Sequence, residues 1–190
     1  MKVRLITPVA LIASLAVAGL AGCQAATPAP SSSHAPAGAG TSTAAVLPVN
    51  SNPIVNASTT SGLTIVSAAV EDNVDSTTHA AIKDRLQVTV RNDTSTELTS
   101  LEIYYVMTDV TTKHKEAYYQ ALTGMTLASK SETTISFDSE SGPGHYPENA
   151  FSIYRSSKNQ VDFTVEVSAA GVQIAHATAT KGSGAGDAAD

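Results

Sequence analysis

Apolar and polar residues alternate with a period of two in several short segments of this chain. The clearest segment is 161–168, in which the odd-numbered residues are apolar and the even-numbered residues are polar. Because successive side chains of a strand point to opposite faces, this pattern is typical of half-buried antiparallel strands. Four predicted strands have the core faces Leu86, Val88 and Val90; Leu101, Ile103, Tyr105 and Met107; Thr133, Ile135 and Phe137; and Val161, Phe163, Val165 and Val167.

Three further segments are rich in Val, Ile, Tyr and Thr and are also predicted to be strands. About seven short strands joined by turns predict an all-β fold, an antiparallel β-sandwich over residues 53–180. Helical structure is expected only as single turns within 75–85 and 147–155. The three additional strands span 62–70, 115–122 and 172–180, and the turn-forming residues are 91–94, 141–144 and Gly171.

The first residues of the chain have the pattern of a targeting segment. A short cationic stretch contains Lys2 and Arg4, and the uncharged, apolar residues 5–20 and two small residues follow it. This arrangement is typical of a secretory signal peptide, because the apolar run is too short and wrongly flanked for a lasting transmembrane helix. We therefore predict that residues 1–22 are a signal peptide.

The string Leu20-Ala21-Gly22-Cys23 resembles the bacterial lipobox, and Cys23 is the single cysteine of the chain. The resemblance implies that the Cys23 thiol receives a diacylglyceryl group and that cleavage leaves lipidated Cys23 as the first residue. Two or three acyl chains hold a protein stably on a bilayer. The expected location is the cell membrane, lipid-anchored on the extracytoplasmic face. The other interpretation of Cys23 is a free thiol.

Two segments flank the predicted sandwich, and their side chains are too polar or too small to form a hydrophobic core. Residues 24–52 hold no charge and consist mainly of Ala, Pro, Ser, Thr and Gly. Such a sequence does not bury enough apolar surface to offset its ordering entropy. We predict that 23–52 is the lipidated Cys with a flexible tether of about 30 Å reach. Residues 181–190 are predicted to be a disordered tail.

The charge of the chain limits the classes of partner. The formal net charge is −6, and removal of 1–22 takes away Lys2 and Arg4, which leaves −8. An acidic protein does not suit nucleic acid, whose phosphates require Lys and Arg. With Cys23 acylated, the chain has no disulfide, no thiol nucleophile and no cysteine zinc site. We expect no nucleic acid and no cofactor, and the membrane, through the lipid on Cys23, is the predicted partner.

Residues 86–137 resemble the bacterial FxLYD-type immunoglobulin-like domains of secreted and lipid-anchored proteins. In that family a Val-x-Val-x-Asn strand is followed by a strand that ends in Asp and by a Leu-x-Pro-Gly-Glu-x₃-Phe strand. Here 128–130 replace the Pro-Gly turn, and 106–109 stand in place of the name motif. The resemblance implies an immunoglobulin-like sandwich, a fold with many functions. The matching residues are Val88, Val90 and Asn92; Asp109; and Leu127, Glu132 and Phe137.

Residues 142–155 resemble a segment of uncharacterised lipoproteins of GC-rich Gram-positive bacteria. Within this segment, Gly142–Asn149 combines two glycines and two prolines with His145, Tyr146 and Glu148. One interpretation is a ligand-contacting loop, in which His145 and Glu148 lie near a metal. The other is a rigid connection between strands, in which Asn149 or Glu148 caps a helical turn that begins near residue 150.

The tyrosines suggest a second candidate surface. Tyr104-Tyr105 and Tyr118-Tyr119 are adjacent pairs within predicted strands, so each pair places one ring inward and one outward. If these strands are neighbours, the outward rings form an exposed aromatic patch of the kind that binds partners. The other interpretation is cross-strand pairing that stabilises the sheet. The candidate binding residues are Tyr104, Tyr118, Tyr119, His145, Tyr146 and Glu148.

Two classes of function remain open. The first is a non-catalytic binding or structural module of the cell envelope, whose partner is an envelope protein or a surface ligand. The second is an envelope enzyme or a metal- or ligand-handling protein that uses the Gly142–Asn149 loop. The sequence contains no nucleophile elbow, phosphate loop, dinucleotide fingerprint or His-Glu-x-x-His pattern. The size of the chain, its acidic charge and the absence of these catalytic motifs favour the binding or structural module.

Overall fold

The computed structural model describes residues 46–70, 86–138 and 140–184. The chain divides into two units, and all of the described residues belong to the second, Ser42–Asp190. The predicted signal peptide, Cys23, the tether before residue 46, the helical turn expected within 75–85 and the end of the tail lie outside the described residues. In the described part of the chain, no helix has the length and apolar character needed to span a bilayer.

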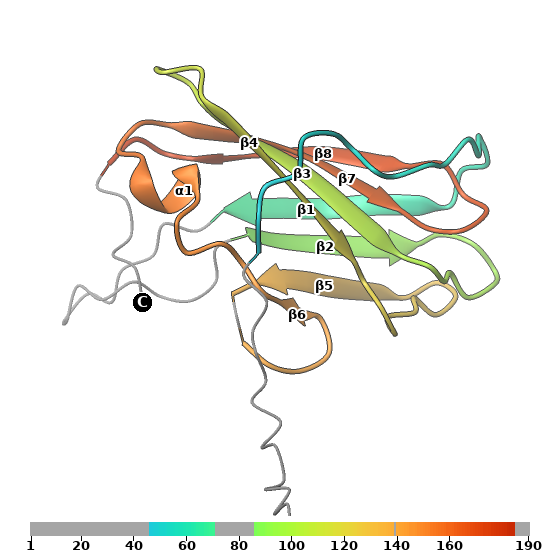
Figure 1. Cartoon of the computed structure of the whole chain (residues 1–190). Helices are drawn as coiled ribbons and strands as arrows, with labels where there is room; N and C mark the ends of the chain where they lie inside the picture. Colours follow the sequence, from blue (N-terminus) through green and yellow to red (C-terminus); the bar gives the residue numbers. More distant parts are fainter. Residues whose placement is uncertain (1–45, 71–85, 139, 185–190) are drawn as a thin grey trace, which may run out of the picture. The chain divides into compact units, whose positions relative to one another are not determined.

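Eight strands and one helical turn form in the described residues (Figure 1). The all-β antiparallel β-sandwich expected from the sequence is confirmed, and the two-residue strand β6 adds to the seven strands predicted. In chain order the elements are β1 (Leu63–Val70), β2 (Leu86–Asn92), β3 (Glu102–Asp109), β4 (Lys115–Ala121), β5 (Glu132–Phe137), β6 (His145–Tyr146), α1 (Ile153–Ser156), β7 (Val161–Ser168) and β8 (Ala175–Lys181).

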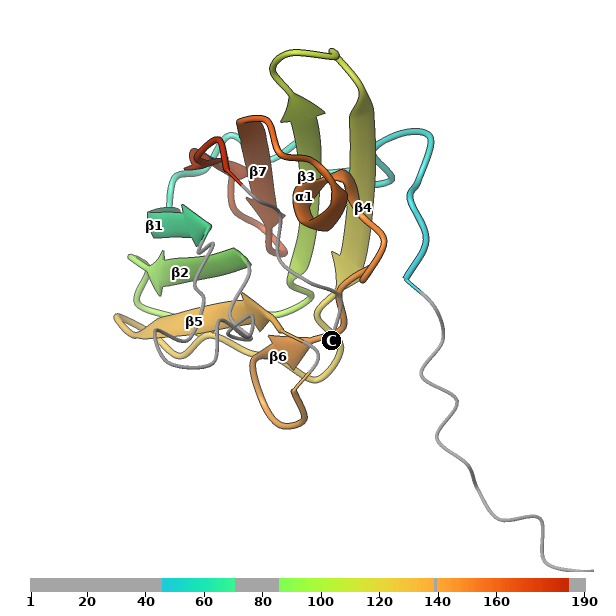
Figure 2. The ribbon, with the colours of Figure 1, turned by 90° about the vertical axis from the view of Figure 1, so that its left-hand side faces the viewer.

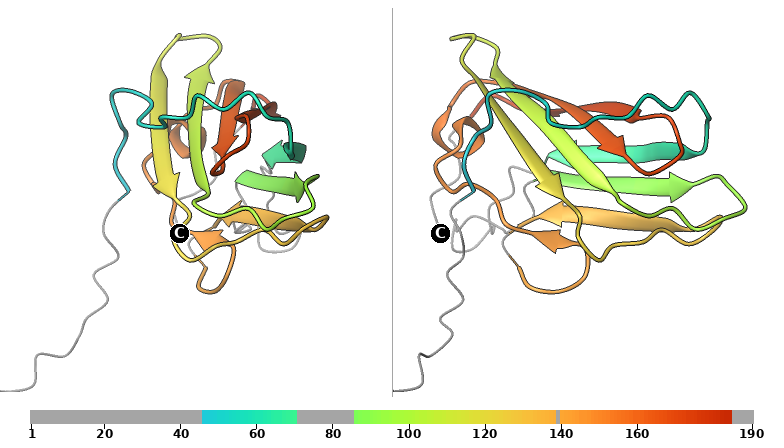
Figure 3. Two further views of the ribbon diagram at one scale, coloured as in Figure 1. Left: turned by 90° about the vertical axis from the view of Figure 1, so that its right-hand side faces the viewer. Right: turned by 45° about the vertical axis from the view of Figure 1, so that its right-hand side comes forward.

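The strands form two sheets, with the orders β1-β2-β5-β6 and β4-β3-β7-β8. The chain crosses from the first sheet to the second between β2 and β3, and it returns between β4 and β5. Figure 2 shows the two layers nearly end-on, and Figure 3 shows the N-terminal described segment crossing the layer that contains β4 and β3. All strand pairs are antiparallel except β5 and β6, which are parallel.

The core lies between the sheets and contains the apolar faces expected from the alternation. All residues of the predicted faces on β2, β3 and β7 are buried, and so are Ile135 and Phe137 of β5. The ring of Tyr105 packs against Phe137 at 5.1 Å and Phe163 at 6.4 Å between centroids, which joins the two sheets. Burial of an aromatic or branched side chain contributes about 1.5–3 kcal/mol, so these faces supply most of the favourable free energy.

The expected phase of β5 fails at two positions. Thr133, predicted to face the core, is half-buried, whereas Ser136, on the predicted polar face, is buried. Ser136 lies between Gln87 of β2 and His145 of β6 in the sheet, so β5 is flanked on both sides at this point. Periodicity within one strand does not reveal such a neighbour, because the neighbour comes from another part of the chain.

The helical turn expected within 147–155 is present but begins later than predicted. The turn α1 starts at Ile153 with Ser152 as N-cap residue, whose side chain makes no capping hydrogen bond. Instead, the Ile153 backbone N–H donates to the Glu116 carboxylate at 3.1 Å. Asn149 accepts from the Phe151 backbone N–H at 2.9 Å, which forms a turn before the helix rather than its cap. A side chain from β4 therefore satisfies the N-terminus of α1.

The last residues of the predicted tether are placed against the second sheet. The Val49 backbone N–H donates to the Ala117 carbonyl of β4 at 2.7 Å. Further along, the Asn52 side chain donates to Glu166 of β7 at 2.7 Å. The segment then continues across this sheet toward β1 (Figure 1). Residues 46–52 are thus attached to the sandwich by hydrogen bonds at two points.

Asn92 and Asp109, two polar residues on which the resemblance to the FxLYD-type pattern rests, have structural roles. The buried Asn92 side chain donates to the carbonyls of Thr96 at 2.7 Å and Leu127 at 2.9 Å. Asp109 accepts from the Ser157 hydroxyl at 2.6 Å and from the Asn159 amide at 2.9 Å. These donors hold the pKa of Asp109 well below its usual value, with Ser157 the largest contributor. Both side chains fix turns at the ends of strands.

Candidate functional site

Backbone pairing between β5 and β6 fixes the Gly142–Asn149 loop. The Ser136 N–H donates to the Gly144 carbonyl at 2.8 Å, and the His145 N–H donates to the Gly142 carbonyl at 3.3 Å. Gly144 has a φ of +85°, and a Cβ at this position would lie 2.9 Å from the Thr134 carbonyl oxygen. Because both the dihedral and the space exclude a side chain, the loop requires glycine here. The loop therefore holds His145 in a defined position.

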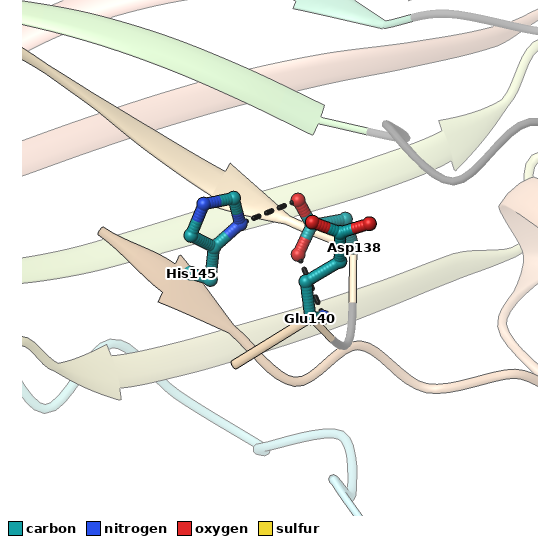
Figure 4. Close-up of side chains that lie close together, drawn as sticks. All are labelled: Asp138, Glu140 and His145. Atoms are coloured by element: carbon teal, nitrogen blue, oxygen red, sulfur yellow. Dashed lines mark hydrogen bonds and ion pairs between the residues drawn. The ribbon is translucent and has the colours of Figure 1, made fainter. Parts of the chain in front are cut away.

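His145 meets two carboxylates at the end of β5 (Figure 4). Its Nδ1 lies 2.8 Å from Oδ2 of Asp138, whose side chain is 0% exposed, whereas 33% of the His145 side chain is exposed. The Glu140 backbone N–H donates to the other Asp138 oxygen at 2.9 Å. One potential ligand atom from each of Asp138, Glu140 and His145 lies within 4.8 Å of the others. We name these three residues the Asp–Glu–His cluster.

Tyr146 fills a gap at the edge of the core. Its ring centroid lies 6.0 Å from that of Phe137, and its hydroxyl lies 3.7 Å from the Met125 sulfur. The side chain is half-buried, and burial raises the pKa of its phenol. The sequence alone did not reveal this partner, because Met125 precedes Tyr146 by 21 residues and lies in a different turn. Tyr146 therefore packs against the core with part of its ring, and the rest of the side chain is exposed.

An open groove runs beside the loop. Its volume is about 650 Å³, and a second groove of about 400 Å³ is also lined by the Thr123–Thr126 turn. Both His145 and Tyr146 line the larger groove, so the two loop candidates contribute to the same concave surface. The lining residues are Thr123, Gly124, Met125, Thr126, Thr133, Gly142, Pro143, Gly144, His145 and Tyr146.

Glu148 does not belong to an open binding surface. Its carboxylate pairs with the Arg155 guanidinium of α1, and the side chains are 7% and 4% exposed. The expectation that Glu148 lies near a ligand with His145 is therefore replaced by a buried ion pair that ties the loop to α1. The sequence pattern did not suggest Arg155, which follows Glu148 by seven residues.

Tyr118 lies inside the sandwich and not on an outer face. It is 1% exposed, and its ring stacks on Tyr105 with centroids 5.4 Å apart. Its hydroxyl donates to Glu116 at 2.7 Å and accepts from the Asn149 amide at 3.0 Å. Burial, followed by the hydrogen bond to Glu116, raises the pKa of this phenol. Tyr118 thus links β4 to the loop before α1.

Tyr104 and Tyr119 are the outward members of their pairs. The alternation predicted this for Tyr104, whereas for the second pair it left open whether Tyr118 or Tyr119 faces outward. They lie directly opposite each other on β3 and β4, and both are half-buried. The Tyr119 hydroxyl donates to Glu102 at 2.5 Å, and this hydrogen bond raises its pKa. Glu166 lies on β7 directly beside Tyr104 of β3, and it accepts a hydrogen bond from the Asn52 side chain. The outward rings therefore belong to a surface that the N-terminal described segment partly crosses.

The six candidate residues fall into three places. His145 and Tyr146 line the larger groove, Tyr104 and Tyr119 lie on the outer face of the other sheet, and the remaining two are buried. In the larger groove, His145 and Tyr146 lie together with residues of the Thr123–Thr126 turn. Comparisons with protein families and with curated proteins found no match for this chain.

Proposed function

We propose that this chain is a lipid-anchored extracytoplasmic protein whose sandwich domain is a non-catalytic binding module of the cell envelope. The observation that carries the proposal is the groove between the Thr123–Thr126 turn and the Gly142–Tyr146 segment. Its volume of about 650 Å³ falls within the range of about 300–1,000 Å³ typical of ligand sites. The partner is an envelope protein or a surface ligand.

The residues of the groove suit contact with a partner. The half-buried Tyr146 and Met125 offer an aromatic ring and a polarisable thioether, and residue types of this kind are enriched in interfaces. The glycines and threonines around them leave room for an approaching chain and offer hydrogen-bonding groups. Rigid backbone pairing at Ser136 and Gly144 holds this surface in place, which lowers the entropic cost of binding.

The sequence supports the anchored location. The signal-peptide pattern of 1–22 and the Leu-Ala-Gly-Cys string place the predicted lipid on Cys23. The uncharged, Pro- and Ala-rich residues that follow suit a tether between the membrane and the sandwich. The domain would then present its groove to partners within reach of the membrane surface. We also propose that the resemblance to the FxLYD-type domains reflects this common architecture.

The anchor is tested by replacing Cys23 with Ala. We expect the wild-type chain to partition into the detergent phase of a phase-separating detergent. The Cys23→Ala chain should appear in the medium or as an uncleaved precursor. If Cys23→Ala partitions with membranes as the wild type does and metabolic labelling with a fatty acid is equal in both, the proposed anchor is wrong.

Binding through the groove is tested by site-specific photocrosslinking on intact cells. A photoreactive amino acid replaces Thr123, which is exposed and lines both grooves, and a control replaces Thr164, which is exposed on the outer face of β7. We expect a discrete crosslinked species from position 123 and not from position 164. Crosslinking that is absent or equal at both positions would contradict the binding function of the groove.

A second candidate, metal or ligand handling at the Gly142–Asn149 loop, is favoured by one specific observation. The buried Asp138 carboxylate contacts the His145 imidazole at 2.8 Å, and Glu140 lies beside them. Imidazole and carboxylate groups are common protein ligands of divalent transition metals.

A further inference from the structure

We propose that Asp138, Glu140 and His145 form a binding site for a divalent transition-metal ion of the Zn²⁺ type. This inference deepens the metal-handling candidate and does not depend on partner binding in the groove or on the lipid anchor. It rests on three side chains that two segments of the chain bring together, at the end of β5 and the start of β6 (Figure 4).

The positions of the potential ligand atoms are close to those a metal requires. Zn²⁺ binds imidazole nitrogen and carboxylate oxygen at about 2.0–2.2 Å, so its ligand atoms lie roughly 3.3–3.5 Å from one another in a tetrahedral site. The His145 Nδ1 and Asp138 Oδ2 are 2.8 Å apart, and the atoms of all three residues lie within 4.8 Å. To reach this spacing around a bound ion, the His145 Nδ1 and the Asp138 Oδ2 would move apart by roughly 0.5 Å.

The chemistry of the cluster favours a cation. Two carboxylates and an imidazole approach one another closely, and two negative groups at this separation repel each other. When the ring proton of His145 is on Nε2, its Nδ1 presents a lone pair toward the same point as the carboxylate oxygens. A divalent ion at that point interacts favourably with all three groups. The competing arrangement is a hydrogen bond in which the His145 ring donates to Asp138.

The imidazole nitrogen and the carboxylate oxygens of the cluster suit some metal ions better than others. Ca²⁺ prefers six to eight oxygen ligands, and Mg²⁺ prefers an octahedron of oxygens with several waters. A site with one nitrogen and two carboxylates suits Zn²⁺ and related first-row ions. Asp138 is buried and fixed by the Glu140 backbone N–H, which orients its carboxylate.

Two of the three residues of the Asp–Glu–His cluster, Glu140 and His145, reach solvent. His145 and its neighbours Gly142, Pro143 and Gly144 line the larger groove, and a third of the His145 side chain is exposed. An ion can therefore enter from solvent, and water or a partner group can occupy the coordination position that the protein leaves open. The pairing of β5 with β6 keeps His145 next to Asp138 in the absence of an ion.

The test uses the purified mature chain without an affinity tag, and with Cys23→Ser so that the thiol does not bind metal. Titration calorimetry with ZnCl₂ should give one site, and Co²⁺ should give the visible absorption of a low-coordinate site. We expect His145→Gln and Glu140→Gln each to weaken Zn²⁺ binding about tenfold or more. The matched controls His114→Gln and His176→Gln remove exposed histidines outside the cluster and should leave the affinity unchanged.

Several results would overturn the proposal. These are no saturable Zn²⁺ binding, equal binding by the His145→Gln chain, or equal affinity for Ca²⁺ and Zn²⁺. Because Glu140 is exposed, Glu140→Gln is expected to fold normally, and a melting curve confirms this for each variant. If His145→Gln fails to fold, unchanged Zn²⁺ binding by a folded Glu140→Gln chain still contradicts the site. Crosslinking from position 123 is measured separately, so failure of the metal site and failure of the binding module are distinguishable.

Discussion

The Glu148 carboxylate and the Arg155 guanidinium face each other inside the protein, with 7% and 4% of their side chains exposed. The pair connects the segment after β6 to the turn α1, whose Ile153 and Tyr154 belong to the core. A buried ion pair of this kind holds two segments in one arrangement, because separating the charges within the protein is costly. It therefore sets the path of the chain between the groove and β7.

Breaking this pair from one side should destabilise the protein strongly. We expect Glu148→Gln or Arg155→Met to lower the free energy of unfolding by about 3–5 kcal/mol, because one charged partner remains buried. Simultaneous replacement by Met at both positions should recover part of this loss. Arg91→Met, which removes a partner of the exposed Asp93, is the control and should change stability little. Urea unfolding curves that are equal for Arg155→Met and Arg91→Met would contradict the prediction.

Two of the positive-φ glycines at the groove, Gly144 and Gly124, should respond differently to a methyl group. Gly144 and Gly124 have φ values of +85° and +79°, so Ala is strained at both, by about 1–2 kcal/mol. At Gly144 the Cβ would also lie 2.9 Å from the Thr134 carbonyl, whereas at Gly124 nothing lies within 4 Å. We expect Gly144→Ala to lower the melting temperature clearly more than Gly124→Ala. Equal shifts in thermal unfolding would show that the loop relaxes freely around residue 144.

The two faces of β7 should differ in their sensitivity to truncation. Phe163 is buried and packs against Tyr105 and Tyr154, so Phe163→Ala should cost about 3–5 kcal/mol. Thr164 is the next residue and is exposed, and Thr164→Ala should change stability by less than about 0.5 kcal/mol. Chemical denaturation measures both, and similar losses would mean that β7 has the opposite phase.

Asp109 should make the protein sensitive to acid. Its pKa in the folded state is depressed below the ordinary value of 3.8 by the Ser157 hydroxyl and by other donors. A carboxyl of this kind stabilises the fold above its unfolded pKa, and this contribution is lost as the pH falls below about 4. We expect Asp109→Asn to be less stable than wild type at neutral pH, with the difference shrinking toward pH 2.

Ser157→Ala provides a graded test of the same interaction. It removes the donor that contributes most to the pKa shift and leaves the Asn159 amide and the backbone donors in place. Its stability between pH 2 and pH 7 should lie between those of the wild type and Asp109→Asn. A constant difference between Asp109→Asn and wild type over this range would exclude Asp109 as the source of acid sensitivity.

The amino-acid sequence by itself determined which side chains of most strands enter the core. The alternation in 161–168 predicted the burial of Val161, Phe163, Val165 and Val167. The alternation in 101–108 predicted that Tyr105 faces inward and Tyr104 outward. These properties are local, because the pleat of a strand sends neighbouring side chains to opposite faces wherever the strand lies. The leader, the lipid on Cys23 and the partner remain predictions from the sequence.

Only the tertiary structure decided what the polar and loop residues do. The contacts of Asp138 with His145, of Glu148 with Arg155 and of Tyr146 with Met125 join residues whose spacing follows no periodic rule. Tyr118 faces inward because β4 pairs with β3 in the register that places it opposite Tyr105. Such contacts depend on how the two sheets and their turns meet, and this is settled by packing of the whole chain rather than by the local pattern of any one segment.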